Sequence, residues 1–144
     1  KLCKIVAYSG YGSTNPLWAL KWSPLSYYMC TTAPSANLSG VDCRLWRTDV
    51  PVCLRVLVED THGKRLSCGF NQMCWHPSGQ MVAVAQGEVI QLWDVAAPRC
   101  ARKLFLPPGA GLVLCMEFSH GGEQLAAGTS AGRQICWDLR KTGQ

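Results

Sequence analysis

The chain has 144 residues, of which 48% are apolar and 16% charged, enough apolar material for the core of one domain. No stretch approaches the ~20 apolar residues that a membrane-spanning helix needs, and residues 1–13 lack the apolar segment of a signal peptide. The net charge of +5 comes from basic residues scattered along the chain, with short clusters only at 99–103 and 140–141. We therefore expect a solvated basic surface, no membrane association and no direct nucleic-acid site. Because the chain begins with Lys1, we also expect it to be an internal piece of a longer protein.

Nine cysteines are an odd number, and no two of them form a Cys-x-x-Cys pair. A disulfide framework and a zinc site are therefore both disfavoured, and we expect no metal or other cofactor. Cys30, Cys53, Cys115 and Cys136 lie in apolar runs, where a reduced thiol behaves as a small buried side chain. This pattern indicates a reducing compartment.

Three segments of the chain resemble one another, and each reads as a series of short strands separated by Gly, Ser, Pro and Asn turns. The repeats cover approximately residues 17–58, 70–106 and 112–140. No segment carries the apolar stripe of a helix, so the expected class is all-β. In chain order, the expected strand segments are 20–24, 27–32, 43–46, 53–58, 73–77, 80–85, 89–94, 100–106, 116–120, 124–128 and 134–138.

Each repeat closes on a tryptophan, at Trp46, Trp93 and Trp137, and an aspartate follows the last two (Asp94 and Asp138). The tryptophans are 47 and 44 residues apart, close to the period of WD repeats. The repeats thus resemble the WD40 family. That resemblance implies a β-propeller in which residues 1–144 supply about three four-stranded antiparallel blades. Three blades cannot close a ring, so the rest of a larger, seven-bladed propeller is expected from elsewhere in the same protein.

One group of WD proteins matches more closely, through Asn15-Pro-Leu-Trp18, Cys43-Arg-Leu-Trp-Arg-Thr-Asp49 and Trp75-His-Pro77. These motifs resemble the propeller of the WD-repeat TBP-associated factors (TAF5 and TAF5-like subunits). The resemblance implies a non-catalytic scaffold of a TFIID- or SAGA-type complex that supports assembly of the RNA polymerase II pre-initiation complex. The protein would bind histone-fold TAFs and would have no small-molecule substrate. It would be located in the nucleus, with the cytoplasm as the alternative.

The chain departs from the WD pattern at the turn before each tryptophan, where Gly40, Gly87 and Ala131 replace the usual aspartate. The usual Gly-His pair before each repeat is also absent. The hydrogen-bond network that these residues build in WD repeats is therefore expected to be largely missing. Stability would then depend more on packing.

The segment Trp137-Asp-Leu-Arg140 resembles the WDxR box of propellers that bind the DDB1 adaptor of cullin-4 ubiquitin ligases. Arg140 could make bidentate contacts with carboxylates there. A substrate receptor of such a ligase is therefore an alternative function, and a solvated Arg140 is the simpler interpretation. A WD scaffold of another assembly is a third possibility.

Catalytic patterns are not found in the sequence. His76 and His120 occupy equivalent turn positions, which favours a structural role, and the nine acidic residues form no pair. We expect no enzyme activity. Among the aromatics, Trp22 and Trp75 occupy the same slot as Phe118 and are predicted to be core residues. Trp18 is the best candidate for an exposed partner-binding anchor.

Overall fold

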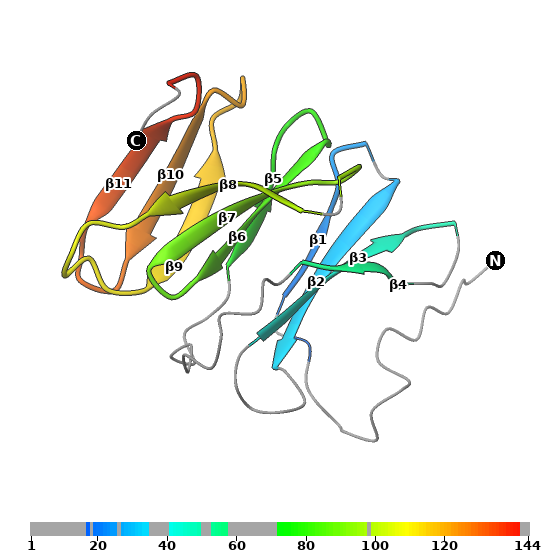
Figure 1. Cartoon of the computed structure of the whole chain (residues 1–144), viewed down its shortest axis with the longest axis horizontal. Helices are drawn as coiled ribbons and strands as arrows, with labels where there is room; N and C mark the ends of the chain where they lie inside the picture. Colours follow the sequence, from blue (N-terminus) through cyan, green and yellow to red (C-terminus); the bar gives the residue numbers. More distant parts are fainter. Residues whose placement is uncertain are drawn as a thin grey trace.

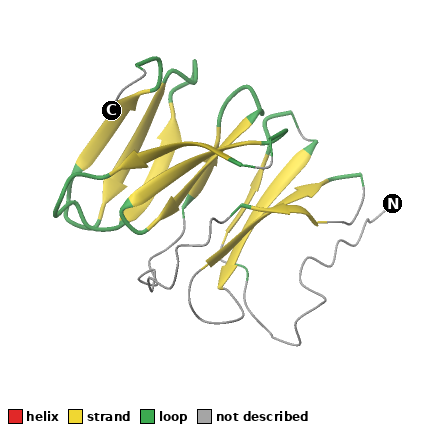
Figure 2. Cartoon of the chain, in the orientation of Figure 1, coloured by secondary structure: helices red, strands yellow, loops and turns green. Residues whose placement is uncertain are grey.

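The computed structural model describes residues 17, 19–25, 27–34, 41–49, 53–57, 72–97 and 99–141. These residues form eleven β-strands in three antiparallel sheets, and none of them is helical (Figures 1 and 2). The expectation of an all-β chain is confirmed. None of the described segments provides a helix that could cross a membrane.

Each sheet takes its strands from one continuous stretch of chain, and neighbours in sequence are neighbours in the sheet. The first sheet contains β1 (Ala19–Trp22), β2 (Tyr28–Pro34), β3 (Val41–Arg47) and β4 (Cys53–Val56). The second sheet contains β5 (Met73–Trp75), β6 (Met81–Gln86), β7 (Val89–Asp94) and β8 (Cys100–Phe105). The third sheet contains β9 (Val113–Phe118), β10 (Gln124–Thr129) and β11 (Gln134–Asp138). The second sheet lies between the other two (Figure 1).

The sequence repeats agree closely with these sheets, with two differences. β2 runs two residues past the expected segment at 27–32, because Ala33 and Pro34 still pair with β3. The third sheet has three strands among the described residues, so the four strands expected in every repeat are seen in the first two sheets. Residues 58–71, which include the end of the first expected repeat, lie outside the described residues.

A bulge recurs at the same place in the first two sheets. The pairing register of β3 with β4 shifts between Leu45 and Trp46, and that of β7 with β8 shifts between Leu92 and Trp93. A β-bulge increases local twist and redirects the side chains that follow it. The first two sequence repeats are therefore structural repeats down to the irregularity before their tryptophans.

Each sheet has two faces, which we name by the tryptophan of its third strand. Trp46, Trp93 and Trp137 define the tryptophan face of the first, second and third sheet, and the other side of each sheet is the opposite face. The opposite face of one sheet packs on the tryptophan face of the next. Side chains alternate along a strand, so the pairing register assigns every residue to one face.

The core between the first and second sheets contains buried side chains from the opposite face of the first and the tryptophan face of the second. Leu45 and Leu57 are each 1% exposed there, against Val82 and Val84 at 0%. Burial of such side chains stabilises by roughly 1.5–3 kcal/mol each. The buried residues of this first core are Cys30, Cys43, Leu45, Leu57, Met73, Trp75, Val82, Val84 and Trp93.

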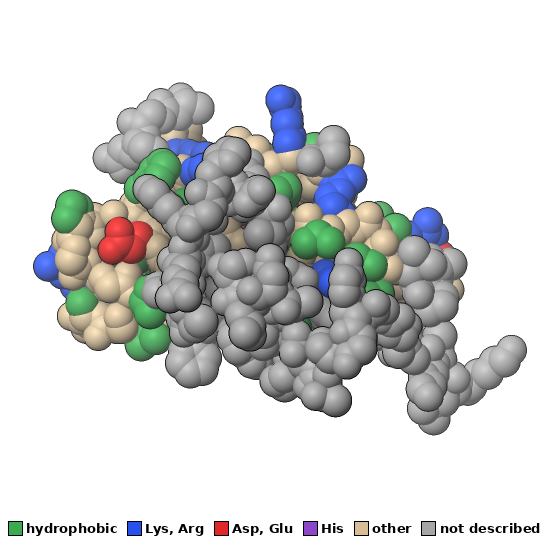
Figure 3. Space-filling model, turned by 60° about the horizontal axis from the view of Figure 1, so that its bottom comes forward, with side chains coloured by type: hydrophobic (Ala, Val, Ile, Leu, Met, Phe, Trp, Pro, Cys, Tyr) green, Lys and Arg blue, Asp and Glu red, His purple; other side chains and the backbone are tan. Residues whose placement is uncertain are grey.

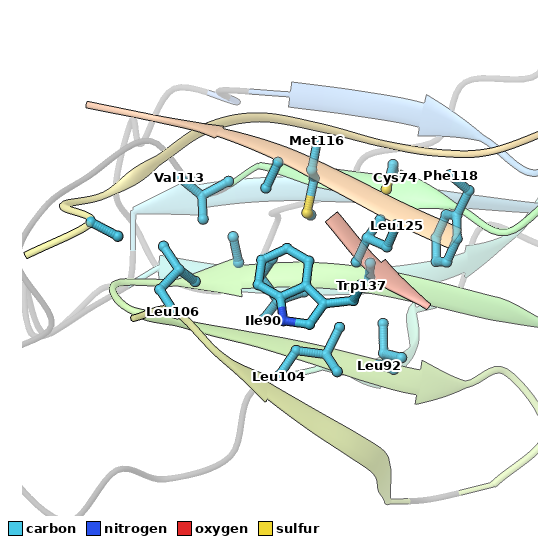
Figure 4. Close-up of a cluster of buried hydrophobic side chains, with 14 residues drawn as sticks. Cys74, Ile90, Leu92, Leu104, Leu106, Val113, Met116, Phe118, Leu125 and Trp137 are labelled. Atoms are coloured by element: carbon cyan, nitrogen blue, oxygen red, sulfur yellow. The ribbon is translucent and has the colours of Figure 1, made fainter. Parts of the chain in front are cut away.

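The second core joins the second and third sheets in the same way (Figure 4). The Trp137 ring lies among the side chains of Ile90 and Leu104, while Phe118 and Leu125 lie to one side of it. Both cores thus combine a third-strand tryptophan with aliphatic side chains of the preceding sheet. Repetition of one packing arrangement explains why the three segments of sequence resemble one another.

The cysteines confirm the expected burial only in part. Cys30 is fully buried and Cys53 half-buried, but Cys115 and Cys136 are exposed. Cys115 and Cys136 belong to the opposite face of the third sheet, on which no described segment packs. The expectation that an apolar run buries its thiol was wrong for these two because burial depends on the next layer, which the run itself does not reveal.

Candidate interaction surfaces

The three repeat-defining tryptophans are buried, with exposures of 3% at Trp46, 4% at Trp93 and 8% at Trp137. Asp94 and Asp138 follow them as turn residues. The Asp94 carboxylate accepts the backbone N–H groups of the two residues that follow Val95, and the Asp138 carboxylate accepts the N–H of the residue two positions on. These five positions therefore serve the sheets and their turns.

Two of the tryptophan indoles find substitutes for the hydrogen bonds that the missing turn aspartates would support. Trp46 Nε1 donates to Thr31 Oγ1 at 2.9 Å on the neighbouring strand, and Trp93 Nε1 donates to Gln91 Oε1 at 3.0 Å. Gln91 in turn donates to Gln86 Oε1 at 3.0 Å, which gives a short buried chain of polar groups. A buried indole N–H needs such an acceptor, since leaving it unpaired costs about 1–3 kcal/mol.

The third repeat lacks this arrangement. The positions equivalent to Thr31 and Gln91 hold Ala127 and Ile135, whose side chains accept no hydrogen bond. Trp137 thus depends on its apolar surroundings, and the expectation that packing replaces the WD network describes this repeat best.

An arginine on the last strand of the first sheet joins it to the second sheet. Arg55 lies on β4, and its Nη1 donates to the carbonyl oxygens of Val95, at 3.4 Å, and of Ala97. Both carbonyls belong to the chain just after β7. The guanidinium therefore satisfies backbone groups that the end of the strand leaves free.

The same contact recurs between the second and third sheets. Arg102 lies on β8 at the position of Arg55, and it donates to the carbonyl oxygens of Leu139 at 3.1 Å and Lys141 at 2.8 Å. These carbonyls follow β11 as Val95 follows β7. In the sequence, a cysteine precedes each of the two arginines by two residues, and this repeated pattern could have identified them. The sequence analysis instead treated both arginines as surface charge.

A histidine at one end of the sheets connects two turns. His76, in the turn after β5, donates from Nε2 to the carbonyl oxygen of Gly122 at 3.1 Å, and its Nδ1 lies 2.8 Å from Ser78 Oγ. A carbonyl can only accept, so Nε2 carries the proton and Nδ1 is the acceptor. The ring also meets Phe118 edge-on, with centroids 5.1 Å apart. Nε2 and the ring therefore join the second sheet to the third, while Nδ1 bonds within the turn that holds His76.

The predicted equivalence of His76 and His120 is wrong by one residue. The backbone N–H of His76 donates to Met81, and in the third repeat the matching N–H is that of Ser119, which donates to Gln124. His120 is the next residue and is exposed. The pair therefore gives no two-histidine site, and the structural role belongs to His76.

The opposite face of the third sheet carries a groove of about 410 Å³. In the second sheet the same face is buried, and Ile90 is 0% exposed there, whereas Gln134 at the equivalent position of the third sheet is exposed. Glu117 likewise takes the position of the buried Cys74. The groove is lined by Cys115, Met116, Glu117, Ala126, Ala127, Gly128 and Gln134.

The tryptophan face of the first sheet is exposed along β1. Trp22 is 56% exposed and Leu20 45%, although register places them where the second sheet has Trp75 and Met73, at 8% and 3%. The prediction that Trp22 shares a slot with Trp75 is confirmed by register, but its burial is not. A core aromatic is exposed here because the described residues place no sheet against this part of the face.

Lys21, Cys74 and Glu117 take equivalent positions on the first strands of the three sheets. Burial raises the pKa of the Cys74 thiol on β5 to about 12, and the nearby Glu117 on β9 adds to this rise, while Lys21 on β1 opposes it. Lys21 and Glu117 thus act on Cys74 from the preceding and the following sheet. Both side chains are exposed.

Arg140, the predicted partner-binding residue, is held by carboxylates of its own sheet. Its Nε and Nη2 donate to the two Asp138 oxygens at 3.0 and 2.9 Å, and its Nη1 lies 3.3 Å from Glu123. Hydrogen bonds from Arg140 lower the pKa of Asp138 to about 2. The side chain is 61% exposed, so it is reachable, but its donors are already engaged.

A second groove, of about 380 Å³, lies at the junction of the first and second sheets. Its lining includes Leu25 and Tyr28 on one side and Gln80 and Asp94 on the other. Asp94 is engaged by the backbone of its own turn, so the groove presents mainly apolar surface. It is a continuation of the sheet junction at its turn end.

The remaining expectations concern Trp18, metal binding and the basic surface. Trp18, the candidate anchor, lies outside the described residues. In the part of the chain that the structure describes, no three His, Cys, Asp or Glu side chains gather into a metal-binding group. On the face in Figure 3, the described Lys and Arg side chains lie at separate places.

The sequence was compared with protein-family models and with curated proteins. It matches no family model and no curated protein.

Proposed function

We propose that the three sheets are consecutive blades of a WD-type β-propeller and that the chain is a non-catalytic protein-interaction scaffold. The observation that supports this most directly is the repeated junction. Twice, one sheet's opposite face packs on the next sheet's tryptophan face, and twice an arginine reaches across to the carbonyls after the third strand. Radial repetition of four-stranded antiparallel sheets is the architecture of a propeller.

The described polar groups favour binding over catalysis. His76 uses Nε2 between two turns and Nδ1 within its own turn, and Arg140 pairs with Asp138 and Glu123 at the surface. Catalysis needs such groups free and directed at a substrate. The surfaces that are free are sheet faces and turns, which suit contacts with other proteins.

Within this class, the segment Cys43-Arg-Leu-Trp-Arg-Thr-Asp49 supports a TAF5-type subunit. Its Arg47 and Asp49 form an exposed ion pair after the first tryptophan, and Trp46 is a buried residue of β3. On this proposal the protein works in the nucleus, in a TFIID- or SAGA-type complex, and binds histone-fold TAFs.

Affinity purification of the tagged full-length protein from nuclear extract tests this function. We expect histone-fold TAFs in the eluate, and equal recovery from an Arg140→Ala variant, because among the described residues the side chain of Arg140 bonds to Asp138 and Glu123 of its own sheet. An eluate with DDB1 and cullin-4 and without TAFs, lost in the Arg140→Ala variant, would instead identify a ubiquitin-ligase receptor.

A further inference from the structure

We infer that the groove at the junction of the first and second sheets is a docking site for an arginine side chain of a partner protein, with an apolar residue beside it. The groove has a volume of about 380 Å³, which is in the range of ligand pockets. It lies between two described sheets, at the end where their strands turn. The inference rests on the proposed scaffold role, since the ligand is a protein, but not on which complex the protein serves.

The third repeat shows what this end of a sheet can hold. There Arg140 donates from Nε and Nη2 to the two Asp138 oxygens at 3.0 and 2.9 Å, and its Nη1 lies 3.3 Å from Glu123. A planar guanidinium that meets one carboxylate through two parallel hydrogen bonds is the arrangement that selects arginine over lysine. The turn therefore forms a guanidinium site that the chain fills with its own side chain.

The second and third repeats align residue by residue at this end. The backbone N–H of Val95 donates to the Gln80 carbonyl oxygen at 2.9 Å. In the same way, the N–H of Leu139 donates to the Glu123 carbonyl oxygen at 2.8 Å. Gln80 therefore takes the position of Glu123, and the residue after Val95 takes the position of Arg140.

The second repeat lacks the arginine and keeps the carboxylate. The position of Arg140 holds Ala96, and Ala96, Asp94 and Gln80 all line the groove. The Asp94 Oδ1 atom accepts two backbone N–H groups of its own turn, and Oδ2 accepts none from the described residues. The groove thus contains the positions that hold Arg140 in the third repeat, with a free carboxylate oxygen and only a methyl group in place of the arginine side chain.

The other wall of the groove comes from the first sheet and is apolar. Leu25 and Tyr28 line it, and Leu25 is 55% exposed although it lies over the turn at Gly79. The aliphatic stem of an arginine packs well on such a surface while its charged end reaches a carboxylate, and an aromatic ring also attracts a guanidinium. This lining therefore suits an arginine that has an apolar neighbour.

The arginines of the chain near this groove are already engaged. Arg55 donates to carbonyl oxygens of the backbone after β7. Arg47, which pairs in register with Tyr28, is bound to Asp49. Neither arginine contacts Asp94, so the charge of this carboxylate is left for a partner.

An NMR titration of the isotope-labelled whole chain with a short capped peptide, one arginine between two leucines, tests the inference. We expect saturable binding that shifts the amide signals of Leu25 and Ala96. Asp94→Asn should weaken this binding about tenfold, because it removes a charged acceptor but keeps an amide oxygen for the turn. Ala96→Arg should abolish it, because it supplies the guanidinium that the third repeat already has.

Asp138→Asn is the matched control, because this equivalent carboxylate lies outside the groove, and it should bind the peptide as the wild type does. The amide spectrum of each variant shows whether it has folded. A peptide with citrulline, which keeps the shape of arginine without its charge, should bind about tenfold more weakly or worse, and a lysine peptide should also bind more weakly.

Three results would overturn the inference: no binding by the wild type, equal binding of the arginine and citrulline peptides, or equal weakening by Asp94→Asn and Asp138→Asn. Equal binding of the lysine peptide would overturn the assignment to arginine. Recovery of histone-fold TAFs by a protein that binds no arginine peptide would remove this inference and leave the proposed function intact.

Discussion

At the turn glycines Gly79 and Gly122, one sheet comes close to side chains of the preceding sheet. Gly122 has φ of 77° and lies under His76, and Gly79 has φ of 70° and lies under Leu25, whose Cγ would be 3.0 Å from an added Cβ. Both therefore require glycine for two reasons, the left-handed backbone and the absence of a side chain. The equivalence of these turns comes from the repeat, and their close approach to the preceding sheet comes from the stacking.

We predict that Gly122→Ala destabilises the protein by about 3 kcal/mol, because it adds both backbone strain and a clash with His76. Gly87→Ala is the control. Gly87 also has a positive φ, of 60°, but nothing lies within 4 Å of an added Cβ, so it should cost only about 1 kcal/mol. Urea unfolding of the two variants measures the difference, and equal losses would show that the His76 contact contributes nothing.

The Asp138–Arg140 pair predicts a pH dependence. The folded protein lowers the Asp138 pKa from 3.8 to about 2, so the folded state binds this proton more weakly than the unfolded state. Its stabilising contribution is therefore complete above about pH 4 and is lost as the pH falls towards 2. Since the pair is exposed, the effect is small.

The check is the free energy of unfolding of wild type and Asp138→Asn between pH 2 and pH 5. The wild type should be the more stable at pH 5, and the difference should vanish near pH 2. A difference that does not change with pH would mean that Asp138 contributes as a turn acceptor and not as a charge.

At the scale of elements, the positions of the strands were predictable, but the irregularities in their pairing were not. Tryptophan spacing and the turn residues placed ten of the eleven strands within about two residues, because alternation and turn chemistry are local. The exception is β9, which begins at Val113, three residues before the expected segment at 116. The bulges before Trp46 and Trp93 and the continuation of β2 to Pro34 depend on the neighbouring strand, which no local pattern describes.

Arg102→Ala should reduce stability by about 1–2 kcal/mol, because it leaves the carbonyls of Leu139 and Lys141 without their donor and removes part of the junction between two sheets. The control is Arg99→Ala, an exposed arginine just before the same strand. Thermal unfolding of both variants measures the effect. If they lose equal stability, Arg102 acts only as surface charge.

At the scale of the whole molecule, thiol reactivity reports which sheet faces are covered. Cys30, Cys43 and Cys74 are buried between sheets, and burial raises the pKa of both Cys30 and Cys74. Cys115 and Cys136 lie on the open face of the third sheet. Thiolate is the reactive form of cysteine, so burial and a raised pKa both slow the reaction of a thiol.

In the native protein, a maleimide should modify Cys115 and Cys136 within minutes and the three buried thiols only on unfolding, as peptide mass spectrometry would show. In a denaturant all should react alike. Rapid modification of Cys74 would contradict the packing of the second sheet on the third.

The sequence by itself determined the strands, the three repeats and the positions of the core tryptophans, because turn chemistry, alternation and repeat spacing act over a few residues. The sequence also identified Arg140 as a candidate partner-binding residue. In the structure, the Arg140 guanidinium is held by Asp138 and Glu123.

Only the tertiary structure decided which faces are covered. Trp22 and Trp75 share one position in the repeat and differ sevenfold in exposure, 56% against 8%, because a sheet precedes one and none of the described segments precedes the other. Arg55 and Arg102 likewise became junction residues only when the sheets stacked. Burial and partner contacts belong to pairs of layers, and a sequence motif describes one layer at a time.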